Sequence, residues 1–114
     1  MKKEYRLLKN PDFKKVLDYK KCVSRENFTI YQRSNQLEHI RVGVSVSSKI
    51  GNSVVRHKIK RQVVNMLNKH LNVNCKYDIV VIVRKKYLEK SFQQNSDDLN
   101  NAISKLIGGK NNEK

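Results

Sequence analysis

The stretch KIGNSVVRHKIKR, residues 49–61, is a glycine-containing turn followed directly by a strongly basic segment. Gly51 permits the positive φ that a tight turn between a strand and a helix often needs. Asn52 or Ser53 can cap a helix that begins here, which leaves backbone N–H groups at its positive end. We therefore expect a helix over residues 53–71 whose start binds an anion such as phosphate.

This expected helix has an apolar stripe and a basic face. The stripe recurs at helical spacing and consists of Val55, Ile59, Val63, Met66 and Leu67. His57, Lys58 and Arg61 point away from the stripe, and Arg56 and Lys60 flank it. A solvated helix surface would show the same pattern as a phosphate-binding one, so the choice depends on the rest of the chain.

The whole chain is basic, with 25 Lys and Arg residues against 10 Asp and Glu and a net charge of +15 over 114 residues. Such an excess is more than solubility needs, and it weakens the compact state through self-repulsion. No apolar stretch approaches the roughly 20 residues that span a bilayer, and Trp, which interfacial helices favour, is absent. The charge therefore indicates a nucleic-acid partner and no membrane.

The length predicts one domain, residues 1–107, followed by a basic tail, residues 108–114, that should fray because it has no apolar anchor. The basic start Met-Lys-Lys is followed by no apolar run, so we expect no signal peptide and a cytoplasmic protein. Cys22 and Cys75 lack metal-site spacing. We expect reduced thiols, although the sequence leaves a bridge between them open.

Helix signals mark both ends of the chain. Asn10, Pro11 and Asp12 form a helix start, and the helix should end near residue 19 or 20. Its packing side would consist of Phe13, Val16 and Leu17. Ser96 is predicted to cap the last helix. The first turn of that helix would contain Asp97 and Asp98, and its packing stripe would be Leu99, Ala102, Ile103, Leu106 and Ile107.

Three segments have the pattern of strands. Residues 28–33 and 39–47 alternate between apolar and polar positions, whereas residues 77–83 are apolar on both faces and predict a central strand. A short extra strand near residues 22–23 would also fit. Strand, basic helix and buried strand make a βαβ unit with parallel strands. The predicted order is α-β-β-α-β-α, a mixed α/β sandwich of the α+β kind.

With these elements placed, the chain resembles the protein subunits of bacterial ribonuclease P. The match to the arginine-rich motif of that family comprises Lys49, Gly51, Asn52, Val54, Arg56, Ile59, Lys60 and Arg61. Further matches are Arg6, Leu7, Lys9, Asp12, Phe13, Phe28, Tyr31, Arg41–Gly43 and Ser45–Ser47. The family pattern differs at four positions, Leu17, His57, Lys58 and Val64.

The resemblance implies a small ribosomal-protein-like sheet with an unusual left-handed βαβ crossover. It also implies an accessory subunit of an RNA-catalysed endonuclease that removes the 5′ leader from precursor tRNA. By motif position, contacts to the catalytic RNA would come from Lys49, Asn52, Arg56, His57, Lys58, Lys60 and Arg61. Contacts to the single-stranded leader would come from a cleft lined by Phe13, Leu17, Thr29, Tyr31 and Arg41.

Protein catalysis has little support in the sequence. His39, His57 and His70 have no metal-binding spacing. We therefore assign no catalytic residue and no metal ligand to the protein, and expect Mg²⁺ to be held mainly by RNA and substrate phosphates. The expected partners are the catalytic RNA and precursor tRNA, with no obligate protein partner and no organic cofactor.

Other function classes remain open. A structural RNA-binding protein of ribosomal type would share the charge, size and element order but show no preference for a 5′ leader. A self-sufficient metal-dependent nuclease, built for example on His39 and Asp78, would cleave without RNA. A DNA-binding regulator is disfavoured because no helix-turn-helix pair is predicted.

Overall fold

The computed structural model describes residues 6–7, 10–37, 39–70 and 76–108. Its helices are α1 (Asn10–Tyr19), α2 (Ser53–His70) and α3 (Phe92–Ile103). Its strands are β1 (Cys22–Ser24), β2 (Phe28–Ser34), β3 (Arg41–Val46) and β4 (Tyr77–Val83). A 3₁₀ segment (Lys85–Glu89) precedes α3, and a π-helical segment (Ser104–Gly108) follows it.

The four strands form one mixed sheet in the order β1-β2-β4-β3. β1 and β4 each pair with β2 in antiparallel orientation. β3 and β4 pair in parallel orientation, and α2 connects them along the chain. The parallel βαβ unit and the short strand at Cys22 are thus confirmed. β4 is an interior strand, which explains why its sequence is apolar on both faces.

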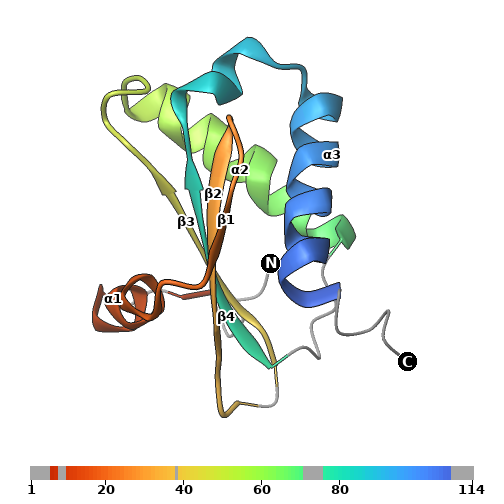
Figure 1. Cartoon of the computed structure of the whole chain (residues 1–114). Coiled ribbons are helices and arrows are strands. Elements are labelled where there is room, and N and C mark those ends of the chain that lie inside the picture. Colours follow the sequence, from red (N-terminus) through yellow and green to blue (C-terminus); the bar gives the residue numbers. More distant parts are fainter. Residues whose placement is uncertain (1–5, 8–9, 38, 71–75, 109–114) are drawn as a thin grey trace.

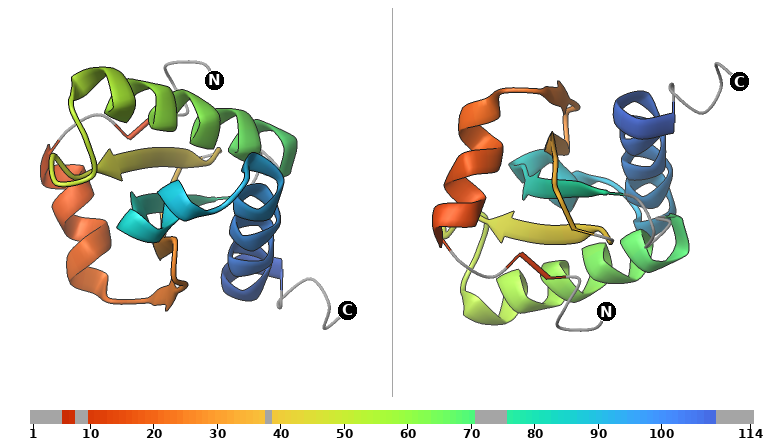
Figure 2. Two further views of the ribbon diagram at one scale, coloured as in Figure 1. Left: turned by 90° about the horizontal axis from the view of Figure 1, so that it is seen from above. Right: turned by 90° about the horizontal axis from the view of Figure 1, so that it is seen from below.

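Helices cover both faces of the sheet (Figure 2). α1 lies against one face, and α2 and α3 pack on the other. The larger core lies between the sheet and the two helices α2 and α3. The apolar stripe predicted for α2 contributes Ile59, Val63, Met66 and Leu67 to it, all buried, and Val55 is partly buried against it. A smaller cluster under α1 is centred on Leu7, Val16 and Val80.

The start of the last helix was predicted wrongly. α3 begins at Phe92, and its cap is Ser91, whose hydroxyl accepts a hydrogen bond from the Gln94 backbone while the Gln94 side chain accepts one from the Ser91 backbone. This reciprocal capping box satisfies two backbone donors that the first turn would otherwise leave free. Ser96 is instead buried inside the helix, and Asp98 pairs with Lys90 rather than occupying a first turn.

The turn before α2 also differs from expectation. None of the described glycines has a positive φ. Gly51 is needed for space, because a Cβ there would lie 2.9 Å from the Cβ of Val55.

Leu71, Cys75 and residues 109–114 lie outside the described residues, as does the side chain of Ile107. Cys22 is an exposed free thiol.

Candidate nucleic-acid interface

The start of α2 is fixed by the residues that the sequence singled out. The Asn52 side-chain oxygen accepts a hydrogen bond from the Val55 backbone at 3.0 Å, so Asn52, not Ser53, is the cap. The Arg56 guanidinium donates back to the Gly51 carbonyl oxygen at 3.2 Å. The turn and the first helical turn therefore hold one another in place, with Arg56 turned toward the helix start.

The basic face of α2 is defined as Arg56, His57, Lys58, Lys60 and Arg61, of which His57 and Arg61 lie opposite the buried stripe and the others flank it. All of these side chains except the half-buried Arg56 are exposed. α2 contains no acidic residue, and no carboxylate of the described residues forms an ion pair with the four cations. The face therefore presents uncompensated positive charge beside the positive end of the helix dipole.

Part of this face is hollowed. A small pocket of about 60 Å³ is lined by Ser53, Arg56, His57 and Lys60. A pocket of this size at a cationic helix start can seat one small anion. Lys49 is exposed in the preceding turn, where its backbone N–H donates to the Ser47 hydroxyl at 3.1 Å.

Most of the residues predicted to contact a single-stranded leader lie on or against the sheet face under α1. Phe13, Leu17 and Tyr31 pack together with Ile82 against the cluster centred on Val16. The register places Tyr31, Val80 and Gly43 side by side across the sheet. The face that carries Tyr31 is therefore the one that carries Arg41 and Ser45, a relation that depends on strand register.

One end of this sheet face is incompletely covered. Thr29, Ile82 and Ser45 form the next row across β2, β4 and β3. Ile82 is only half buried although it belongs to an interior strand, and Ser45 is exposed. Ile82 was not among the predicted site residues. The sequence feature that points to it is the apolar character of both faces of residues 77–83.

Arg41 occupies the other end of the same face and is held by two carboxylates. Its guanidinium donates to both Asp78 oxygens, at 2.9 and 2.7 Å, and lies 3.4 Å from Asp12 of α1. The hydrogen bonds to Asp78 raise the pKa of Arg41 above its usual value, and the two negative charges add to that effect. Asp78 is buried and also accepts a hydrogen bond from the Asn35 amide.

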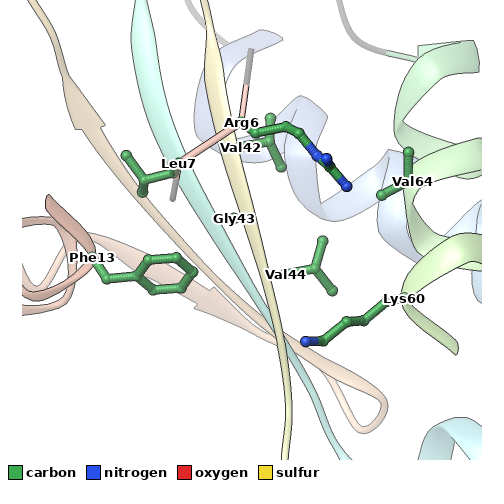
Figure 3. Close-up of a pocket in the computed structure, with 8 residues that line it drawn as sticks. All are labelled: Arg6, Leu7, Phe13, Val42, Gly43, Val44, Lys60 and Val64. Carbon is green, nitrogen blue, oxygen red and sulfur yellow. The ribbon is translucent and has the colours of Figure 1, made fainter. Parts of the chain in front are cut away.

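A further pocket connects the two predicted surfaces at the edge of the sheet (Figure 3). Its volume is about 270 Å³, and it is lined by Arg6, Leu7, Phe13, Val42, Gly43, Val44, Lys60 and Val64. Phe13 comes from α1 and Lys60 from α2, so the pocket bridges the two layers around β3. Arg6 is brought here because the Leu7 N–H bonds the Val42 carbonyl at 2.8 Å. Arg6 and Lys60, which are far apart in the sequence, thus line the same pocket.

Neither a metal site nor a membrane span is evident within the described ranges. In those ranges no group of three or more His, Cys, Asp and Glu side chains is placed to hold a metal ion, and Asp12, Asp78 and Asp98 are engaged by Arg41 or Lys90. No helix there has the length and apolar character to cross a bilayer.

Comparisons with known proteins agree on one family. Residues 1–107 match the family model described as Ribonuclease P. A protein from Macrococcus caseolyticus named Ribonuclease P protein component is 38% identical over 108 residues, covering 94% of this chain and 90% of that protein. A protein of the same name from Streptococcus agalactiae is 41% identical over 93 residues, covering 82% and 85%.

Solved structures show the same fold. A Staphylococcus aureus RNase P protein mutant with defective mRNA degradation activity has a TM-score of 0.83 and 33% identity, with 92% of each chain covered. The RNase P protein from Thermotoga maritima has a TM-score of 0.73 and 28% identity, covering 84% of this chain and 92% of that one.

Proposed function

The chain belongs to the ribonuclease P protein family, and we propose that it assists a catalytic RNA in removing the 5′ leader from precursor tRNA. Membership makes it a component of an endoribonuclease that processes tRNA. In the proposed role the protein neutralises phosphates and selects precursor over mature tRNA. The catalytic RNA and precursor tRNA are its partners, and the complex works in the cytoplasm.

The observation that carries this proposal is the uncompensated basic face of α2. Arg56, Lys58, Lys60 and Arg61 gather at the start of one helix and lack carboxylate partners in the described residues, whereas Lys14 and Lys90 have such partners. Unpaired cations at a capped helix start are suited to the phosphates of a folded RNA. We assign contact with the catalytic RNA to this face together with Lys49 and Asn52. The main effect of Asn52 is to fix the start of the helix.

The sheet face under α1 is the proposed leader site. Phe13, Leu17 and Tyr31 offer partly buried apolar surface, and Thr29 lies in the open row beside Ile82. Single-stranded RNA is bound largely by such stacking surfaces combined with cations. Arg41 would act here mainly by holding α1 to the sheet, since its guanidinium is already engaged by Asp78 and Asp12.

No protein catalytic residue is proposed. The described carboxylates do not assemble into a set of Mg²⁺ ligands, so Mg²⁺ would be held by RNA and substrate phosphates, which suit a hard cation that retains several waters. The protein would contribute binding and orientation. The cations of α2 would bind the catalytic RNA, and the sheet face under α1 would bind the leader of the precursor tRNA.

Reconstitution tests this proposal against its rivals. Precursor tRNA is incubated at low Mg²⁺ with the protein alone, the cognate catalytic RNA alone, and both together. We expect cleavage at the mature 5′ end only in the combination. Cleavage by the protein alone would instead indicate a protein nuclease, and no gain in the mixture would favour an RNA-binding protein of ribosomal type.

The leader site is tested by Tyr31→Ala. If a base stacks on this ring, affinity for precursor tRNA should fall by on the order of 1–3 kcal/mol while affinity for mature tRNA stays unchanged. Tyr19→Ala is the matched control, because Tyr19 is 58% exposed and lies outside the cluster that contains Tyr31. Equal losses for the two substrates would argue against a leader site on this face.

A further inference from the structure

A third pocket lies on the flank of α2 opposite Lys60. Its volume is about 300 Å³, and its walls come from α2, the 3₁₀ segment and the start of α3. Figure 1 shows these elements meeting beyond the end of β4, away from α1. The lining residues are Val55, Lys58, Ile59, Gln62, Tyr87, Leu88, Lys90, Phe92 and Asn95. This pocket is separate from the small pocket at Ser53 and from the sheet face under α1.

The pocket has a buried apolar floor and exposed apolar walls. Ile59 and Tyr87 are 3% and 4% exposed, whereas Leu88 and Phe92 are 50% and 40% exposed. Of the five exposed large hydrophobic side chains in the described residues, two thus line this one pocket. Large apolar side chains that gather around a pocket and remain in water are typical of a binding site.

Hydrogen bonds hold this pocket in shape. The Tyr87 hydroxyl donates to the Gln62 side-chain oxygen at 2.8 Å, which ties the 3₁₀ segment to α2. The Asn95 amide donates to the Tyr87 carbonyl at 3.1 Å, and its oxygen accepts from Asn27 at 2.8 Å. Since Asn95 and Asn27 are both buried, the floor needs no rearrangement to accept a ligand.

Charge on the rim indicates what the ligand carries. Lys58 belongs both to the basic face of α2 and to this pocket, and no carboxylate of the described residues pairs with it. Lys90, on the other side, is held by Asp98 at 3.1 Å and by Glu26 at 3.5 Å. An anionic group next to Lys58 and a flat apolar group against Phe92 together match a nucleotide.

We propose that this pocket binds one unstacked nucleobase of the RNA partner, with Phe92 and Leu88 contacting the base and Lys58 its phosphate. The proposal rests on the proposed function, since the basic face of α2 must already lie on RNA. The pocket volume is at the lower end for ligand sites, which fits one base better than a peptide helix. A second copy of the chain is disfavoured because each copy carries a net charge of +15.

The absence of Trp from the chain supplies a local probe. Phe92→Trp introduces a single indole fluorophore at the pocket, and a stacked base should quench its emission. Titration of this full-length variant with a single-stranded adenosine hexamer should give saturable quenching. Tyr19→Trp, exposed on α1, is the control and should show little quenching. The quenching should persist in a Phe92→Trp, Tyr31→Ala variant, which lacks the proposed leader stack.

Assembly with the catalytic RNA gives the second measurement. Phe92→Ala should weaken assembly on the order of tenfold, as expected when one stacked base is lost, and Phe92→Tyr should restore it. Urea unfolding of the variants controls for stability. Assembly unchanged in Phe92→Ala but weakened in an Arg56→Ala, Lys60→Ala variant would overturn this inference and leave the proposed function intact.

Two other results would also overturn the inference. If neither Phe92→Ala nor the α2 double variant affects assembly, the proposed function itself fails. If sedimentation shows that the wild-type protein is a dimer and Phe92→Ala a monomer, the pocket is an interface between copies. Saturable quenching in the Phe92→Trp variant together with the tenfold loss in Phe92→Ala would support a base-binding pocket.

Discussion

Arg41 is held in place by carboxylates from two other elements of the fold. The family resemblance placed it among leader contacts, yet its guanidinium binds Asp78 of β4 through two hydrogen bonds and reaches Asp12 of α1. A planar bidentate pair of this kind is geometrically demanding, and lysine cannot reproduce it. Arg41 therefore joins α1 to the sheet on which the leader is proposed to lie.

Removal of the Arg41 charge should destabilise the fold. In Arg41→Met the Asp78 carboxylate, only 5% exposed, keeps the Asn35 amide but loses its cation. A buried charge left in this way costs about 3 kcal/mol of unfolding free energy, measurable by urea denaturation. Lys14→Met removes an exposed ion pair with Asp18 and should cost less than about 1 kcal/mol. Equal small losses would show that Asp78 does not depend on Arg41.

Gly43 is a second residue whose role lies in a contact. A Cβ at this position would lie 2.8 Å from the Phe13 Cε2 atom and closer still to its Cζ. The ring of Phe13 can therefore rest on β3 only because residue 43 has no side chain. The position of Phe13, a proposed leader contact, is thus set by a glycine on another element.

Gly43→Ala should displace the Phe13 ring more than it weakens the fold. We expect a loss of about 1 kcal/mol in stability from overpacking, together with a several-fold loss of affinity for precursor tRNA and none for mature tRNA. Asn101→Ala, at an exposed position of α3 on the other side of the sheet, is the control for both measurements. Unchanged precursor binding in Gly43→Ala would remove Phe13 from the leader site.

At the scale of the element, α2 combines two functions in one helix. Its stripe from Ile59 to Leu67 is buried in the main core, and its basic face carries the unpaired cations. Arg56 and Lys60, one turn apart, line the small pocket at the helix start. Because the stripe fixes the rotation of the helix, packing also determines where these charges point.

The salt dependence of assembly should report the charges of α2. Replacement of Arg56 and Lys60 by Ala should reduce the slope of log affinity against log salt by roughly 1.4–1.8, because two phosphate contacts are lost. Lys21→Ala with Lys105→Ala removes the same charge from exposed positions elsewhere and should leave the slope nearly unchanged. If both double variants change the slope equally, binding depends on net charge rather than on this helix.

At the scale of the whole molecule, charge opposes the compact state. A net charge of +15 on 114 residues implies substantial self-repulsion, and few of the cations are neutralised by ion pairs among the described residues. An anion that binds the native state alone should stabilise it by mass action.

Sulfate should therefore raise the unfolding midpoint in urea at millimolar concentration, well beyond the effect of sodium chloride at equal ionic strength. The Arg56→Ala, Lys60→Ala variant should lose much of this gain because its anion pocket is incomplete. Sulfate also stabilises folded proteins in general because it is excluded from their surface. This effect acts equally on the wild-type protein and the double variant and therefore cancels in the comparison. Identical gains would indicate charge screening without a specific site.

The sequence by itself determined the features that local pattern encodes. The period of the α2 stripe, the Asn52 cap, the alternation of β2 and β3 and the interior character of β4 all follow from spacing along a continuous segment. The start of α3 is the exception. Ser96, which two acidic residues follow, was predicted as the cap, whereas the capping box forms at Ser91 and packing buries Ser96.

The tertiary structure alone decided which residues meet. A register shift of one residue would turn Tyr31 to the opposite face, so its place beside Val80 and Gly43 depends on pairing between distant strands. The same holds for Arg41 with Asp78, for Phe13 over Gly43, and for the pocket that joins Lys58 to Phe92. Periodicity specifies a face within each element, whereas contacts between elements depend on how those faces pack together.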